Sequence, residues 1–76
     1  MEERLLSVFK RVFRRDFNGG NVFVSDVEEW DSLSHIKMVM EIESEFGFAI
    51  APDDIPSLYS DFAMVLDFVT NRTSGV

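Results

Sequence analysis

The fold is decided by residues 31–47, whose sequence is DSLSHIKMVMEIESEFG. Asp31 and Ser32 carry side-chain oxygens that suit the unpaired amide groups at the start of a helix. Over residues 33–46 apolar side chains recur with a helical period, and Gly47 is the residue type that most often ends a helix. We therefore predict an amphipathic helix over 33–46. We expect one polar face of Ser34, Lys37, Glu41, Ser44 and Glu45. The rest of the helix surface is apolar and is interrupted by His35 and Glu43: Leu33, Ile36, Met38, Val39, Met40, Ile42 and Phe46.

Shorter patterns on both sides of this stretch predict a small bundle. Residues 2–15 have apolar side chains on one face and basic ones on the other, and residues 62–71 form a last helix with an inward stripe of Phe62, Val65, Leu66 and Val69. Ser60 or Asp61 can cap that helix. Residues 52–55 suggest one further helical turn, which Pro56 limits. The predicted fold class is all-α: a four-helix bundle of three main helices and one short one.

A long connection separates the first two helices. Residues 16–30 lose the helical period, and Asn18-Gly19-Gly20-Asn21 is rich in turn-forming residues. A hairpin around the glycines is conceivable, but we favour a loop that is held on the core by its apolar residues. We interpret the glycines as the stop of the first helix. A loop of this length inside a compact domain is uncommon and often functional.

Composition bounds the function. The chain has 76 residues, a formal net charge of −7, no cysteine and one histidine, which predicts a single domain over 1–76 with a flexible tail at 72–76. Residues 1–15 carry five cations and two acids, and the remainder carries two cations and twelve acids. Such acidity disfavours nucleic acid and anionic lipid and indicates basic protein partners, although solubility alone also explains it. Without an apolar run of about 20 residues or a signal peptide, we expect a cytoplasmic protein with no stable membrane insertion.

One motif has a specific setting. Trp30-Asp31-Ser32-Leu33 follows the long loop and starts the clearest helix, and Glu45-Phe46-Gly47-Phe48-Ala49-Ile50 follows at helical length. This order resembles the acyl carrier proteins and the related peptidyl carrier domains over nearly the whole chain. The residues Asp31, Ser32 and Leu33 are its most specific part.

The resemblance implies a carrier rather than an enzyme, with no catalytic or metal-ligating residue of its own. A phosphopantetheinyl transferase would move 4′-phosphopantetheine from coenzyme A onto the Ser32 oxygen, with Asp31 and Leu33 beside the cofactor. In the family the aspartate at the position of Asp31 is associated with the magnesium-dependent transfer. The thiol of the arm would carry an acyl or aminoacyl group to acyl-activating, condensing or transferring enzymes with basic docking surfaces. The docking residues that the resemblance indicates are Leu33, Lys37, Met38, Glu41 and Glu45.

The helix departs from the family in its charge. Many relatives have acids where this chain has Ser34 and Lys37, which puts binding to a standard fatty-acid synthase in doubt and favours a specialised fatty acid, polyketide or related pathway. The cargo stays open among fatty acyl, polyketide, amino acid and lipopolysaccharide-related groups. We expect a monomer.

Alternatives come from other classes of protein. An unmodified acidic helical module that binds a partner would explain the charge and the fold. A small hydrolase site of Ser32, His35 and Asp31 is a third hypothesis, although a lone histidine beside apolar residues is more often packed than catalytic. Trp30 has two roles open to it, packing the loop on the bundle or contacting cargo, and we favour packing.

Overall fold

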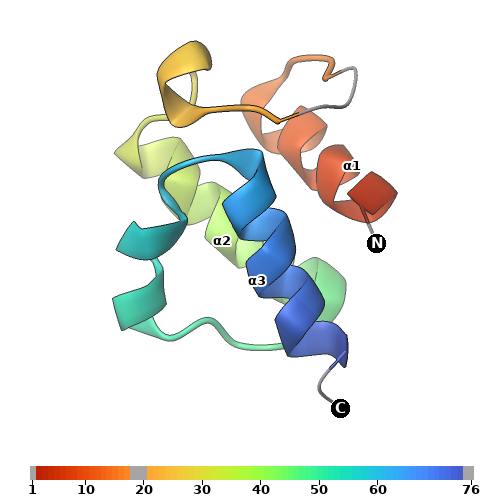
Figure 1. Cartoon of the computed structure of the whole chain (residues 1–76). Helices are drawn as coiled ribbons and strands as arrows, with labels where there is room; N and C mark the ends of the chain where they lie inside the picture. The colour runs from red at the N-terminus through yellow and green to blue at the C-terminus, as the bar shows by residue number, and fades with distance from the viewer. Residues whose placement is uncertain (1, 18–20, 75–76) are drawn as a thin grey trace.

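The chain folds as a small all-α bundle. The computed structural model describes residues 2–17 and 21–74. Its elements in chain order are α1 (Glu2–Phe13), the 3₁₀ turn η1 (Val24–Asp26), α2 (Ser32–Phe46), the 3₁₀ turns η2 (Pro52–Asp54) and η3 (Pro56–Leu58), and α3 (Phe62–Ser74) (Figure 1). Three main helices are confirmed, and the short fourth helix is the η2–η3 pair. None of the described helices is both long and apolar enough to cross a membrane.

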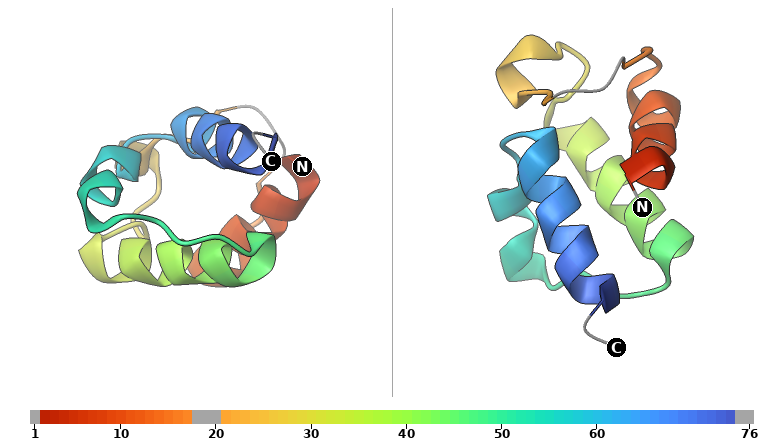
Figure 2. Two further views of the ribbon diagram at one scale, coloured as in Figure 1. Left: turned by 90° about the horizontal axis from the view of Figure 1, so that it is seen from below. Right: turned by 45° about the vertical axis from the view of Figure 1, so that its right-hand side comes forward.

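The core lies between the three α-helices and the η2–η3 turns, which surround it when the bundle is seen from below (Figure 2). Phe9 of α1 is fully buried. Its ring makes edge contacts with those of Trp30 in the long loop and Phe62 in α3, at centroid distances of 5.3 and 4.9 Å. Such edge-to-face geometry is favourable between aromatic rings. One side chain thus joins the first helix, the loop and the last helix.

The helix α1 is shorter than predicted. We expected it to continue to residue 15, but it ends at Phe13, and Arg14 adopts a left-handed backbone with a φ of 55°. The Arg14 amide donates to the Lys10 carbonyl at 2.9 Å. Arg14 therefore takes the capping role that we assigned to glycine. The glycines of the turn, residues 19 and 20, lie outside the described residues.

The long loop is attached to the start of α3. The Val24 amide donates to the Ser60 carbonyl at 2.8 Å, and the Phe62 amide donates to the Val22 carbonyl at 2.7 Å. Residues 22–24 thus pair with residues 60–62, and this pairing takes the place of a hairpin in the described part of the loop. Trp30, at the end of the loop, is buried, so the expectation of a loop held by its apolar residues is confirmed.

The last helix carries the predicted inward stripe. Phe62, Val65 and Val69 are buried, and Leu66 is half-buried. Asp61 caps this helix, since its Oδ1 accepts the Met64 amide at 3.1 Å.

The C-terminal tail is shorter than predicted. Residues 72–74 form the end of α3. The Arg72 side chain donates to the Ala49 carbonyl at 3.3 Å and lies over the Phe68 ring. These contacts are the physical reason why the helix continues past residue 71. Residues 75 and 76 of the predicted tail lie outside the described residues.

Candidate functional site

Ser32 is the first residue of α2, and Asp31 caps that helix. Asp31 has an extended backbone, and its Oδ1 accepts the Ser34 amide at 2.9 Å. At the other end, Gly47 has a φ of 77° and donates its amide to the Glu43 carbonyl at 2.9 Å. The predicted helix is confirmed at both ends, one residue longer at its start. The cap fixes where the chain turns into the helix, and so it fixes the position of Ser32.

The carboxylate beside Ser32 is held in its charged form. The pKa of Asp31 is lowered from its usual value of 3.8, chiefly because the Ser34 amide donates to it. The residue is exposed. Asp31 is therefore an ionised carboxylate beside the exposed Ser32, in addition to its role as the cap of α2.

The Ser32 hydroxyl is accessible. The residue is exposed, and no hydrogen bond joins this hydroxyl to any of the residues that the structure describes. The first amides of a helix have no partner within the helix, and they favour negative charge. The Asp31 carboxylate interacts with the Ser34 and Leu33 amides at this end of α2. This end of the helix favours a negative group such as a phosphodiester, whereas the ionised Asp31 carboxylate repels one unless a cation is shared.

Behind Ser32 lies a buried hydrogen-bond network centred on His35. The Trp30 Nε1–H donates to His35 Nδ1 at 2.9 Å, and His35 Nε2 lies 2.7 Å from the Ile55 carbonyl oxygen. Because Nδ1 accepts, the proton of the neutral imidazole is on Nε2, which donates to Ile55. Burial lowers the pKa of His35 from 6.5, against the opposing effect of the Ile55 bond.

Tyr59, the residue that follows η3, also belongs to this network. Its hydroxyl donates to the Trp30 carbonyl at 3.0 Å, and its ring meets the His35 ring edge-on at 5.0 Å. Trp30, the residue before Asp31, is thus hydrogen-bonded through its side chain to His35 and through its carbonyl to Tyr59. The chain that precedes Ser32 is held by α2 and by the segment that follows η3.

These contacts decide between the roles open to His35 and Trp30. Both ring nitrogens of His35 are engaged, and its side chain is buried, so it offers Ser32 no free base. Trp30 is only 2% exposed and packs on Phe9 and Phe13. Both residues join the loop to the bundle.

The predicted docking face needs correction at Met38. Met38 is fully buried in the core, because its side of α2 faces the other helices. Its side chain is therefore not available to a partner. Leu33, also predicted to dock partners, is 73% exposed, so its side chain is available to a partner. Ile36 and Met40, which were not among the predicted docking residues, are 44% and 63% exposed. Their exposure depends on where the neighbouring elements pack, which the helical period alone does not give.

The two acids of the predicted docking face form ion pairs with α1. Glu41 binds Arg11 at 3.0 Å, and Glu45 binds Arg4 at 3.2 Å. Arg4 also donates to the Glu45 carbonyl at 2.7 Å. The basic face of α1 therefore neutralises both acids, whereas Lys37 is exposed.

Two surface grooves lie away from Ser32. One groove is lined by residues at the end of α1 and on α2: Arg11, Val12, Arg14, Lys37, Met40, Glu41 and Ser44. The other is lined by residues of η3 and α3: Ser57, Leu58, Met64, Asp67, Phe68, Asn71 and Arg72. Neither is lined by Asp31, Ser32 or Leu33. The interior behind Ser32 is occupied by Trp30 and His35.

Comparisons of the chain with protein-family profiles, with curated proteins and with solved structures give no match. The function is therefore argued from the site itself.

Proposed function

We propose that the chain is a carrier protein that bears 4′-phosphopantetheine on Ser32. The observation that carries this proposal is the exposed, unpaired Ser32 hydroxyl at the first position of α2, directly after the capping carboxylate of Asp31. The small helical bundle and the long first loop add support, because they agree with the resemblance to acyl carrier proteins.

The modification is a phosphoryl transfer catalysed by a separate enzyme. The Ser32 oxygen attacks the pantetheine-bearing phosphorus of coenzyme A, a phosphodiester forms, adenosine 3′,5′-bisphosphate leaves, and the serine proton passes to a base of the transferase. The group attached in this way supplies a thiol, which holds an acyl or aminoacyl group as a thioester. The chain has no cysteine, so it has no thiol of its own.

The residues around Ser32 contribute position and charge. The amides at the start of α2 stabilise the phosphodiester, and Asp31 assists the magnesium-dependent transfer, as the resemblance implies. Trp30 and His35 keep the attachment point in place. Because these side chains fill the interior behind Ser32, we expect the arm and its cargo to lie outside the bundle.

Partner enzymes would dock on α2 beside the attachment point. Leu33 and Ile36 offer an apolar contact near Ser32, and Lys37 lies next to them along the helix. Acyl-activating, condensing or transferring enzymes of a specialised fatty acid or polyketide pathway suit this weakly acidic face best. Apolar contact at the centre of an interface contributes more to affinity than charge at its rim.

The direct test is intact mass. We expect the purified chain, incubated with coenzyme A and a phosphopantetheinyl transferase of broad specificity, to gain the mass of one phosphopantetheinyl group. Ser32→Ala should gain no mass. Ser34→Ala, the same exchange two residues further along the helix, should gain it normally. An unchanged wild-type mass, or the same gain in Ser32→Ala, would overturn the proposal.

The second candidate is an unmodified interaction module. The exposed apolar residues Leu33, Ile36 and Met40 favour it, because α2 offers them to a partner without any modification. It predicts no mass gain in the same incubation. It also predicts that a partner binds Ser32→Ala as tightly as the wild type.

A further inference from the structure

Five of the seven lysine and arginine side chains have a polar partner among the described residues, and two have none. Four of the seven form ion pairs: Arg4 with Glu45, Lys10 with Asp16, Arg11 with Glu41, and Arg15 with Glu29. A fifth, Arg72, donates to a carbonyl and lies over two aromatic rings. Arg14 and Lys37 have neither an ion pair nor a hydrogen bond through their side chains to any of the described residues.

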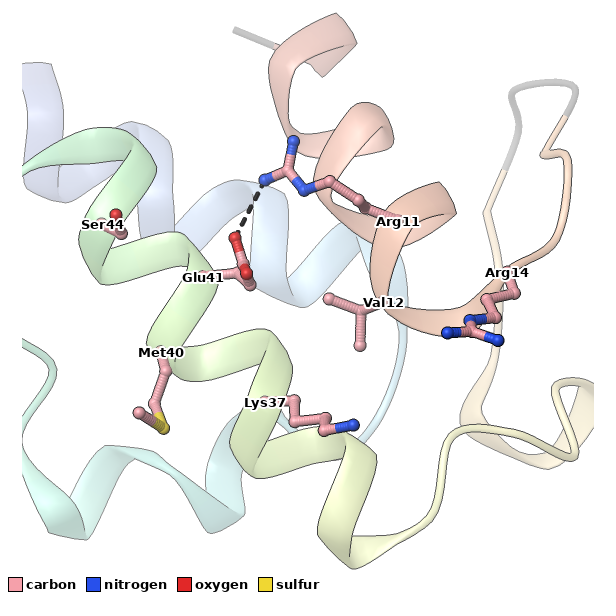
Figure 3. A pocket seen from close by; sticks show the side chains of 7 residues that line it. All are labelled: Arg11, Val12, Arg14, Lys37, Met40, Glu41 and Ser44. Atoms are coloured by element: carbon pink, nitrogen blue, oxygen red, sulfur yellow. Dashed lines mark hydrogen bonds and ion pairs between the residues drawn. The ribbon is translucent and has the colours of Figure 1, made fainter.

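These two cations line one groove. The groove lies between α1 and α2, has a volume of about 420 Å³, and is bordered by Arg11, Val12, Arg14, Lys37, Met40, Glu41 and Ser44. Figure 3 shows the Lys37 side chain extending from α2 to the side on which α1 ends, with Val12 above its tip and Arg14 beyond. Two cations without an ion pair among the described residues thus line one groove, in a chain whose net charge is −7.

The other residues that line the groove include an acid that is already paired and two apolar side chains. The Glu41 carboxylate is bound by Arg11 at 3.0 Å, so it does not neutralise the two free cations. Val12 is half-buried and Met40 is 63% exposed, which gives an apolar surface beside the charges. An occupant therefore needs negative charge at one end and an apolar group next to it.

We propose that this groove is a docking site for an acidic protein segment, whose carboxylates meet Arg14 and Lys37 while an apolar side chain contacts Val12 and Met40. Charge complementarity identifies this occupant. A nucleic acid would need a longer row of cations, and the acidic remainder of the surface repels a phosphate backbone. The inference goes beyond the carrier function and does not depend on it, since Ser32 is not part of the groove.

The test uses a synthetic amphipathic helical peptide that carries Glu and Leu on one face, and a matched peptide with Gln in place of every Glu. A short single-stranded oligonucleotide is the third probe. Binding to the ¹⁵N-labelled chain is followed by the amide shifts of Arg14, Lys37 and Met40. The variants are Lys37→Gln and Arg14→Gln. Lys10→Gln and Arg15→Gln are controls that remove the same charge from paired positions outside the groove.

We expect the acidic peptide to shift these three amides saturably, and each groove variant to weaken its affinity about two- to fivefold, as exposed ion pairs do. The controls should change the affinity less than either groove variant, and added salt should weaken binding. The proposal is overturned if the acidic peptide does not bind, if the Gln peptide binds equally well, or if the groove variants bind like the wild type. The proposal is also overturned if the oligonucleotide shifts the same three amides more than the acidic peptide does.

Discussion

The Trp30 Nε1–H donates to His35 Nδ1 at 2.9 Å inside the bundle, and the two residues stand on either side of Ser32 in the chain. This bond closes a short loop that contains Asp31, Ser32, Leu33 and Ser34. The buried pair therefore determines the geometry of the exposed site. Its consequences can be measured without knowing the cargo.

Removing the His35 imidazole should destabilise the fold. In His35→Leu the Trp30 Nε1–H and the Ile55 carbonyl lose their partner inside the protein, and unpaired buried polar groups are costly. We expect the free energy of unfolding to fall by about 2–4 kcal/mol in urea titrations. Exposed Lys37→Ala is the control and should change it by less than about 0.5 kcal/mol. A His35→Leu protein as stable as the control would contradict the network.

Stability should decrease in mild acid. The pKa of His35 is lowered from 6.5 in the folded state, so below this pH the unfolded chain binds more protons than the folded one. The contribution of His35 is complete above about pH 6.5 and is lost as the pH falls toward the folded pKa. We expect the urea midpoint to fall between about pH 7.5 and about pH 5, and to fall less in His35→Gln.

The same pH titration separates His35 from Asp31. The pKa of Asp31 is lowered from 3.8, so its contribution is present above that pH and is lost only in stronger acid. A wild-type midpoint that does not change in mild acid, or one that falls equally in His35→Gln, would contradict the assignment to His35.

Two exchanges at Asp31 separate its capping role from its charge. Asp31→Asn keeps an oxygen that can accept the Ser34 amide, whereas Asp31→Ala removes it, so we expect only the alanine variant to lose about 1 kcal/mol of stability. If the carboxylate assists the attachment of phosphopantetheine, both variants should be modified more slowly than the wild type. The rate of mass gain measures this. Normal modification of Asp31→Asn would restrict Asp31 to capping.

Two methionines two residues apart on α2 should respond in opposite ways. Met38 is fully buried and Met40 is 63% exposed. Met38→Ala leaves a cavity, so we expect a loss of about 2–5 kcal/mol in urea unfolding. Met40→Ala should change stability by less than about 0.5 kcal/mol. Similar losses in the two variants would contradict the orientation of α2.

Sequence reasoning succeeded where a local signal sets the structure. Asp31 and Gly47 mark the ends of α2 through their own backbone and side-chain chemistry, and the stripe of Phe62, Val65 and Val69 follows from the helical period alone. These features need no knowledge of the neighbouring elements.

The sequence-based predictions failed where an uncommon backbone conformation or contacts with distant residues determine the structure. The helix α1 ends at Phe13 because Arg14 adopts a left-handed conformation, which a non-glycine residue rarely adopts. The burial of Met38 and the exposure of Met40 depend on which side of α2 the other helices cover. The engagement of Glu41 and Glu45 depends on arginines some 30 to 41 residues earlier in the chain. The candidate site was found from the motif, but the bonds that hold it were not.

Fragment mass spectrometry of the modified chain tests whether Ser32 is the attachment point. After incubation with coenzyme A and the transferase, we expect the added phosphopantetheinyl mass on the fragment ions that contain Ser32. It should be absent from fragments that contain Ser34 but not Ser32. An addition on Ser34 or any other residue, or no addition at all, would contradict it.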